Sequence, residues 1–179
     1  MAKPDISSGQ RIIDKAEAIA RTVISQQVFY NSQDCNKNHR QLLETMVGAA
    51  IWYFPQSEDL WTGSISVEAL KAMATSQKPK AVKLTKDHHY PRKGAAAELF
   101  ALNWTEVDDP AAEMLKHYLN CYGQFNDVLP EENKRLVKDQ KTHTFGSPEH
   151  AYELAGIGLK QLSRPLLNAI RASGHQLAS

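Results

Sequence analysis

Apolar residues at helical spacing recur through most of this sequence and constrain its fold more than any other feature. The first such segment places five of them on one helix face: Ile12, Ala16, Ile19, Ala20 and Val23. Similar stripes are found in residues 42–54, 66–74, 93–102, 110–122 and 152–172. A helix is also predicted from Pro130, because acids lie in its first turn and basic residues follow, as the helix dipole favours. Asp109 followed by Pro110 is typical of a helix start, and Gly123 of a helix end. The spacing therefore predicts a predominantly helical chain.

Two short segments do not follow the helical pattern. Residues 80–90 alternate weakly and end at Pro91, and residues 124–129 form a short apolar run before Pro130. Both patterns favour strands. We expect an α+β fold in one domain, since 179 residues suit a single core. The domain is predicted to contain a helical N-terminal segment (1–76), a two-strand-plus-helix core with a helical insertion (80–141) and C-terminal helices (147–179).

The composition narrows the class of protein. Two cysteines in 179 residues are too few for a secreted disulfide scaffold. No apolar run approaches the roughly 18 residues that a membrane span needs, and the first residues contain no apolar leader. We expect a cytoplasmic protein that does not bind a membrane.

Charge is balanced overall but unevenly distributed. The formal net charge is +1, which excludes a bulk polycation. Residues 77–93 contain six basic residues and one acid, whereas residues 98–113 contain five acids and no lysine or arginine. The basic stretch is long enough to contact the phosphates of a nucleic acid.

The densest polar cluster lies within this basic stretch, in residues 87–93. It reads Asp87-His88-His89-Tyr-Pro, followed by Arg92 and Lys93. A neutral imidazole can take a proton from water, and a carboxylate can hold Mg²⁺. Cations bind backbone phosphates. These are the groups that hydrolysis of a phosphodiester requires.

In these residues the chain resembles the HNH, or ββα-metal, nuclease superfamily, in which a strand carries Asp-His-x-x-Pro. The second half of such a site is a strand that runs into a helix, and residues 128–136 have that layout, with Asn133 in the first helical turn. The resemblance covers about a third of the chain, residues 80–141. The interval of 45 residues between His88 and Asn133 is filled by predicted helices.

The resemblance implies a role for each matching residue. Asp87 is implied as a ligand of Mg²⁺ or Mn²⁺, and His88 as the general base that activates water. Asn133 is implied as a second metal ligand, or as the residue that orients His88. The expected phosphate-binding residues are basic side chains around the motif: Lys83, Lys86, Arg92, Lys93, Lys134 and Arg135.

The assignment of the base between the two histidines stays open. Some members of the family use the first histidine of a pair as ligand and the second as base. Strand alternation places Asp87 and His89 on one face and His88 on the other, which favours His89. The motif match favours His88, which we prefer.

The sequence thus predicts a metal-dependent endonuclease that hydrolyses DNA, as in an accessory nuclease of a phage or mobile element. RNA as the substrate and a homodimer as the active form stay open. The alternative is a non-catalytic helical module that binds nucleic acid or a protein through residues 78–93. A zinc site is a third alternative, which we do not favour; its ligands would be Cys35, His39, His117 and Cys121.

Overall fold

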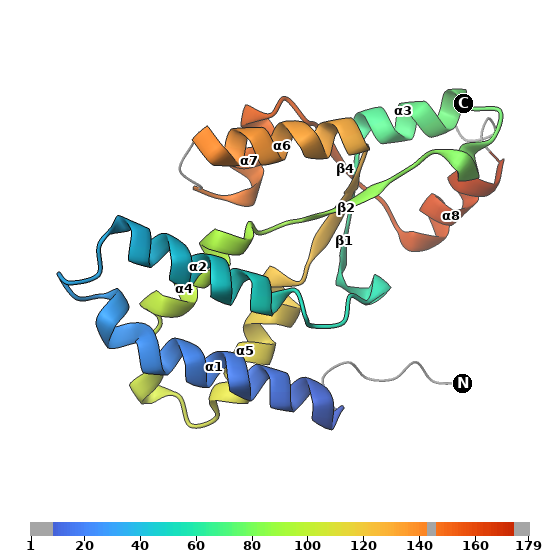
Figure 1. Cartoon of the computed structure of the whole chain (residues 1–179). Coiled ribbons are helices and arrows are strands. Elements are labelled where there is room, and N and C mark those ends of the chain that lie inside the picture. The colour runs from blue at the N-terminus through green and yellow to red at the C-terminus, as the bar shows by residue number, and fades with distance from the viewer. Residues whose placement is uncertain (1–8, 143–145, 174–179) are drawn as a thin grey trace. The chain divides into compact units, whose positions relative to one another are not determined.

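The computed structural model describes residues 9–142 and 146–173, with side chains at 9–139 and 146–172. The outer ends of the predicted N-terminal and C-terminal helical segments, residues 1–8 and 174–179, lie outside the described residues. The chain divides into two compact units (Figure 1). Unit 1 contains residues 1–60 and 90–124, and unit 2 contains residues 61–89 and 125–179. Each unit therefore combines segments that are distant in the sequence.

The described residues of unit 1 form helices joined by loops, with no strand among them. It contains α1 (Gln10–Tyr30), α2 (Lys37–Ile51), η1 (Glu58–Leu60), α4 (Arg92–Ala101), η3 (Trp104–Glu106), α5 (Pro110–His117) and the π-helical segment η4 (Tyr118–Tyr122). Helix α1 packs against α5, and α2 packs against α4. The predicted stripe of α1 is buried at Ala16, Ile19, Ala20 and Val23. The side chain of Asp109 caps α5, as the sequence predicts.

Unit 2 is built around a small mixed sheet. Its elements are β1 (Trp61–Ser66), α3 (Val67–Thr75), η2 (Pro79–Ala81), β2 (Thr85–His88), β3 (Phe125–Val128), α6 (Pro130–Thr142), α7 (Pro148–Leu154), β4 (Leu159–Gln161) and α8 (Arg164–Ser173). The strand order is β2-β3-β1-β4. Strand β3 is parallel to β1 and antiparallel to β2, and β4 is antiparallel to β1.

Two apolar clusters pack the sheet of unit 2. In one of them, Val128 contacts Leu136 of α6 and Tyr152 of α7. In the other, Ile65 of β1 packs with Met73 of α3 and Leu167 of α8. Residues two apart in a strand share a face, so Asn126 lies on the face of Val128, which α6 and α7 cover.

The fold class is confirmed: the protein is α+β and predominantly helical. The two predicted strands form as β2 and β3, and α6 follows β3 directly. The sheet nevertheless has two further strands that the sequence pattern does not predict. β1 lies inside the N-terminal segment predicted to be helical, residues 1–76, which is therefore not wholly helical.

The segment predicted to be helical over residues 152–172, with Pro165 as the place of a break, is instead interrupted earlier, by a strand. Helix α7 ends at Leu154, β4 follows, and α8 begins at Arg164. The physical reason is Gly156, whose φ of +64° turns the chain out of the helix.

Among the described residues, no helix combines the length and the apolar character that crossing a bilayer demands.

Candidate functional site

Asp87 lies near the end of β2 and is buried, with 8% of its surface exposed. The hydroxyl of Tyr152, from α7, donates a hydrogen bond to its Oδ2 atom. Burial raises the pKa of Asp87 to about 6, although the hydrogen bond from Tyr152 lowers it. Among the described residues, no lysine or arginine forms an ion pair with this carboxylate. Asp87 is therefore a buried acid whose negative charge is only partly compensated.

His89 belongs to the same polar network. Its Nδ1 atom lies 3.2 Å from Nδ2 of Asn126, a fully buried residue of β3. Its Nε2 atom lies 3.9 Å from the carboxylate of Glu149 in α7. Burial lowers the pKa of His89, and the nearby Glu149 carboxylate opposes this shift. The network thus joins Asp87 and His89 through side chains of β3 and α7.

His88 takes the opposite orientation. It pairs with Phe125 across the β2–β3 ladder, while Asp87 pairs with Asn126, so the two residues project to opposite faces of the sheet. On the face of His88, the Nζ atom of Lys86 lies 4.6 Å from the centre of the Phe125 ring. The alternation expected from the sequence is therefore present: Asp87 shares its network with His89.

Asn133 lies in the first turn of α6, where its backbone N–H donates to the carbonyl of Leu129. Helix α6 leaves β3 beyond Val128, which pairs with Thr85 of β2. His88 is three residues further along β2, or roughly 10 Å. Within the described residues, no hydrogen bond joins the Asn133 side chain to Asp87 or His88. The prediction that Asn133 orients His88 through a hydrogen bond is therefore not supported by the described contacts.

The predicted phosphate-binding residues are divided between the two units. Arg92 and Lys93 begin α4 in unit 1, and the Arg92 guanidinium stacks 3.5 Å from the centre of the Trp52 ring. The other four belong to unit 2: Lys83, Lys86, Lys134 and Arg135. Lys134 pairs with Glu131 at 2.8 Å on the same helix.

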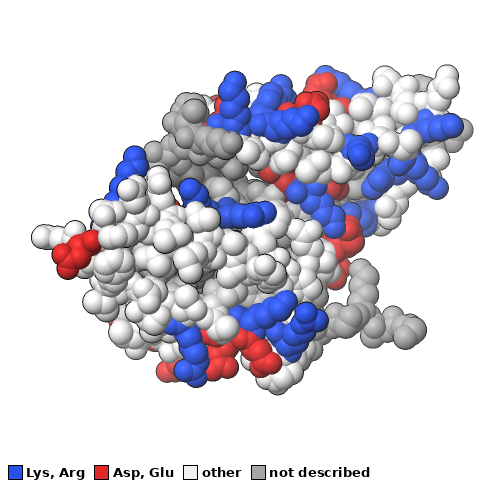
Figure 2. Space-filling model, in the orientation of Figure 1, with Lys and Arg blue, Asp and Glu red and all other residues white. Residues whose placement is uncertain are grey.

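Unit 2 is the more basic of the two units. It has 12 lysines and arginines and 8 aspartates and glutamates, whereas unit 1 has 9 and 12. Three of the acids in unit 2 are buried, namely Asp87, Asp127 and Glu132. Figure 2 shows lysine and arginine side chains over α6 and over the segment between α3 and β2. The surface of unit 2 thus has a positive excess that suits a polyanion.

The donor set for a metal ion is small. In residues 9–139 and 146–172, no group of three or more His, Cys, Asp or Glu side chains is placed to hold an ion. Asp87 offers a hard oxygen ligand of the kind that Mg²⁺ prefers, and Mg²⁺ often binds one or two carboxylates together with water and substrate phosphates. Asp87 is the residue of the polar network that would hold such an ion.

The alternative zinc ligands all belong to unit 1 and have other surroundings. Cys35 is a buried free thiol and Cys121 a partly buried one. The ring of His39 lies 5.4 Å from that of Phe29. His117 lies 3.1 Å from the carboxylate of Glu113.

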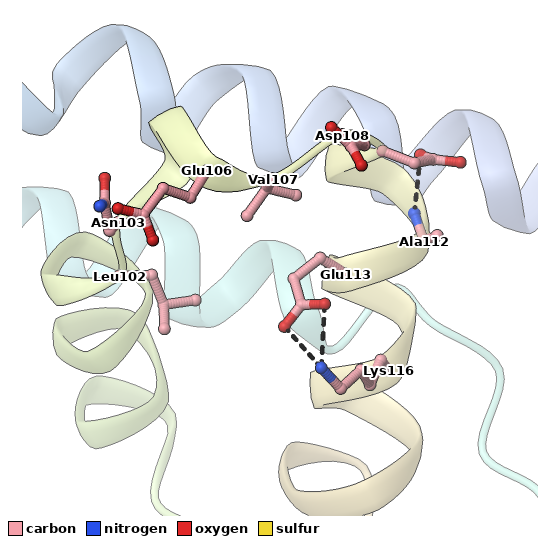
Figure 3. A pocket seen from close by; sticks show the side chains of 9 residues that line it. Leu102, Asn103, Glu106, Val107, Asp108, Ala112, Glu113 and Lys116 are labelled. Atoms are coloured by element: carbon pink, nitrogen blue, oxygen red, sulfur yellow. Dashed lines mark hydrogen bonds and ion pairs between the residues drawn. The ribbon is translucent and has the colours of Figure 1, made fainter.

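A pocket of about 540 Å³ in unit 1 is acidic (Figure 3). Nine residues line it: Leu102, Asn103, Glu106, Val107, Asp108, Asp109, Ala112, Glu113 and Lys116. Asp109 caps α5 through the N–H of Ala112, and Glu113 pairs with Lys116 at 3.0 Å. Four carboxylates repel phosphate, so this pocket does not suit a nucleic acid.

A shallower hollow of about 440 Å³ in unit 2 borders the polar network. It is lined by α7 and the loop that follows: Glu149, Tyr152, Glu153, Gly156, Ile157, Gly158 and Leu159. Tyr152 contacts Asp87, and Glu149 faces His89. The hollow thus provides an approach to the network from solvent.

The hydroxyl of Thr62, from β1, also joins the network by donating to Oδ1 of Asn126. The sequence pattern did not reveal the residues that complete the network: Asn126, Tyr152, Thr62 and Glu149. One signal for Asn126 was present, because two polar residues, Asn126 and Asp127, interrupt the apolar strand predicted at 124–129. A buried polar residue needs partners, which makes such a position informative.

Comparisons of the chain with protein-family models, with curated proteins and with solved structures find no match.

Proposed function

We propose that unit 2 is a divalent-metal-dependent endonuclease of HNH type, which hydrolyses DNA phosphodiesters with water activated by a histidine. The observation that carries the proposal is the order β2, β3, α6, with β2 and β3 antiparallel. The first strand ends in Asp87 and His88, and His89 follows. This is the order of elements and residues that the sequence resemblance implies.

The residues supply the groups that the reaction needs. Water forms a bond to phosphorus, the bond from phosphorus to the leaving oxygen breaks, and His88 takes the proton of the water. Mg²⁺ or Mn²⁺, held by Asp87 and by substrate oxygens, would offset the charge of the phosphate. Lys83 and Lys86 would bind the flanking phosphates. Asn133 as a second ligand stays a prediction.

The test is nicking of supercoiled plasmid DNA in the presence of Mg²⁺ or Mn²⁺. Wild-type protein should nick, and His88→Ala should reduce the rate at least 100-fold, because the base is lost. His39→Ala is the matched control, since it removes an exposed histidine of unit 1. Equal rates for wild type, His88→Ala and His89→Ala would contradict the proposal.

A second candidate function is non-catalytic binding of nucleic acid, which the basic surface of unit 2 favours. Under this alternative, the protein binds DNA or RNA without cleaving it. Lys83→Ala would then weaken binding, while His88→Ala would leave it unchanged. Binding without metal-dependent nicking by the wild-type protein would select this function over the first.

A further inference from the structure

The amide of Asn126 is the centre of the polar network, and its orientation is fixed by its neighbours. Asn126 is 0% exposed, so each of its polar atoms needs a partner. The hydroxyl of Thr62 donates to the Oδ1 atom of Asn126. The same hydroxyl oxygen accepts from the N–H of Ser64 at 3.0 Å, which leaves its proton available for Asn126. The carbonyl end of the amide therefore faces Thr62.

The NH₂ end of the amide faces Tyr152 and His89. Tyr152 uses its own proton to donate to Asp87, which leaves its oxygen to accept a hydrogen bond from Asn126. The second N–H of Asn126 lies against Nδ1 of His89 at 3.2 Å. A reversed amide would set its carbonyl oxygen against the lone pairs of the Tyr152 oxygen. Thr62 and Tyr152 thus select the same orientation.

This orientation determines where His89 carries its proton. Because Asn126 donates, Nδ1 of His89 must accept, and the proton of the neutral ring is on Nε2. Nε2 is the ring atom that lies 3.9 Å from Glu149, and the His89 side chain is 25% exposed. The N–H group of His89 thus points away from the buried network.

We infer that Asn126 is a positioning residue that holds neutral His89 in the Nε2–H tautomer, as a hydrogen-bond donor to a phosphate oxygen of the substrate. His89 in this form does not act as the base, because Nε2 already carries a proton and Nδ1 is occupied by Asn126. The base role proposed for His88 stays a prediction, because His88 projects to the face of the sheet opposite to Asp87. The roles assigned to the two histidines rest on the proposed nuclease function, whereas the tautomer does not.

The tautomer is measured directly by NMR of the full-length ¹⁵N-labelled protein, without divalent cations and at a pH where His89 is neutral. Long-range correlations from the ring C–H protons to both ring nitrogens distinguish a protonated nitrogen from an unprotonated one. The His89 signals are identified by their absence in His89→Gln. Protonated Nε2 with unprotonated Nδ1 is the expected result. The reverse tautomer, or an equal mixture of the two, would overturn the inference.

Variants of the network residues test whether Asn126 determines the tautomer of His89. Asn126→Asp replaces the donor by an acceptor, so His89 should change to the Nδ1–H tautomer. Thr62→Val combined with Tyr152→Phe removes both hydroxyls that fix the amide, and the tautomers should then mix, whereas Thr62→Ser keeps its hydroxyl and should match wild type. The double variant keeps the test decisive if Asn126→Asp does not fold. An unchanged His89 tautomer in the folded double variant would contradict the role of Asn126.

Plasmid nicking separates the tautomer from the nuclease function. If the wild type nicks DNA, Asn126→Asp should reduce the rate roughly 100-fold, as expected for loss of one oriented donor at a reacting phosphate. Nicking at the wild-type rate by Asn126→Asp with the changed tautomer would overturn the donor role. The expected tautomer in a wild-type protein that never nicks would support the inference and overturn the nuclease function.

Discussion

At the scale of single residues, the burial of Asp87 is not explained by any gain in the stability of the fold. A carboxylate buried to 8% exposure loses hydration, and one hydrogen bond from Tyr152 restores only some of the loss. The raised pKa of Asp87, about 6, expresses the same cost. A residue that destabilises the fold at neutral pH is expected where chemistry needs it.

The raised pKa predicts how stability depends on pH. Between its unfolded value of 3.8 and about 6, the folded protein binds a proton at Asp87 more tightly than the unfolded chain does. The contribution of Asp87 therefore favours folding at low pH and is lost as the pH rises through about 6, by about 3 kcal/mol at most. Asp87→Asn removes this dependence and should be more stable than wild type at pH 8. Urea unfolding of both proteins with a chelator at pH 5 and pH 8 measures the free energy of unfolding. If Asp87→Asn were less stable than wild type at pH 8, the predicted cost of burying the Asp87 charge would be wrong.

The two histidines should differ in the substitutions that they tolerate. Glutamine offers an N–H donor but cannot act as a base at neutral pH. We expect His89→Gln to nick plasmid at least tenfold faster than His89→Ala, because it can still donate to a phosphate. His88→Gln should be as slow as His88→Ala. The opposite pattern, with rescue at position 88 only, would exchange the roles of the two residues.

At the scale of helices and strands, unit 2 depends on the two places where a parallel strand runs into a helix. β1 runs into α3 and β3 runs into α6, and the buried carboxylate of Glu132 joins both junctions. Its Oε2 atom accepts from the hydroxyl of Ser66, the N-cap of α3, and from the N–H of Leu129 at 2.8 Å. A negative charge at the start of α6 also interacts favourably with the helix dipole.

Glu132 should therefore be critical for stability and its neighbour Glu131 should not. Glu132→Ala leaves the Ser66 hydroxyl and the Leu129 N–H without this acceptor, and should cost about 2–4 kcal/mol of unfolding free energy. Glu131 is 79% exposed and pairs only with Lys134, so Glu131→Ala should change stability by less than about 0.5 kcal/mol. Urea unfolding compares them, and equal effects would contradict the role of Glu132.

The elements that the sequence predicted and those that it missed differ in length and in local signals. α1, α3 and α4 have regular apolar spacing or a capping residue, as at Ser66, and α6 has acids in its first turn. These signals are local. β4 has three residues, and Leu159 and Leu162 happen to keep helical spacing. Gly156 was the local signal that the stripe had ended. β1 and β4 form because they pair within the sheet, which no local pattern expresses.

In the candidate site, too, the sequence predicted the local features and missed those that depend on long-range contacts. Asp87, His88 and His89 are consecutive, so the sequence could place them at the end of one strand. Asn126 and Tyr152 join them only through contacts 37 and 65 residues apart in the chain. Long-range pairing of β2 with β3, which spacing does not reveal, therefore determines which groups surround Asp87.

At the scale of the whole molecule, charge is divided between the two units. The acidic excess of unit 1 and the basic excess of unit 2 nearly cancel, so the net charge of +1 does not reveal the basic excess of unit 2. The acidic pocket belongs to unit 1. We therefore expect nucleic acid to contact unit 2.

The division of charge predicts the salt dependence of DNA binding. Lys83 is an exposed residue of unit 2, and Lys83→Ala should lower the slope of log affinity against log salt by about 1, the value for one phosphate contact. Lys116→Ala, in the acidic pocket of unit 1, is the control and should leave the slope unchanged. Fluorescence anisotropy with a labelled duplex measures both, and equal slopes for the two variants would argue against unit 2 as the binding surface.

The most direct test of the proposed function is metal-dependent nicking of plasmid DNA by wild type and Asp87→Asn, with both proteins shown to be folded. We predict nicking by the wild type that requires Mg²⁺ or Mn²⁺ and stops with a chelator. We predict no nicking by Asp87→Asn, although this variant is at least as stable. Wild-type protein that does not nick with either cation, or Asp87→Asn that nicks at the wild-type rate, would contradict the proposed function.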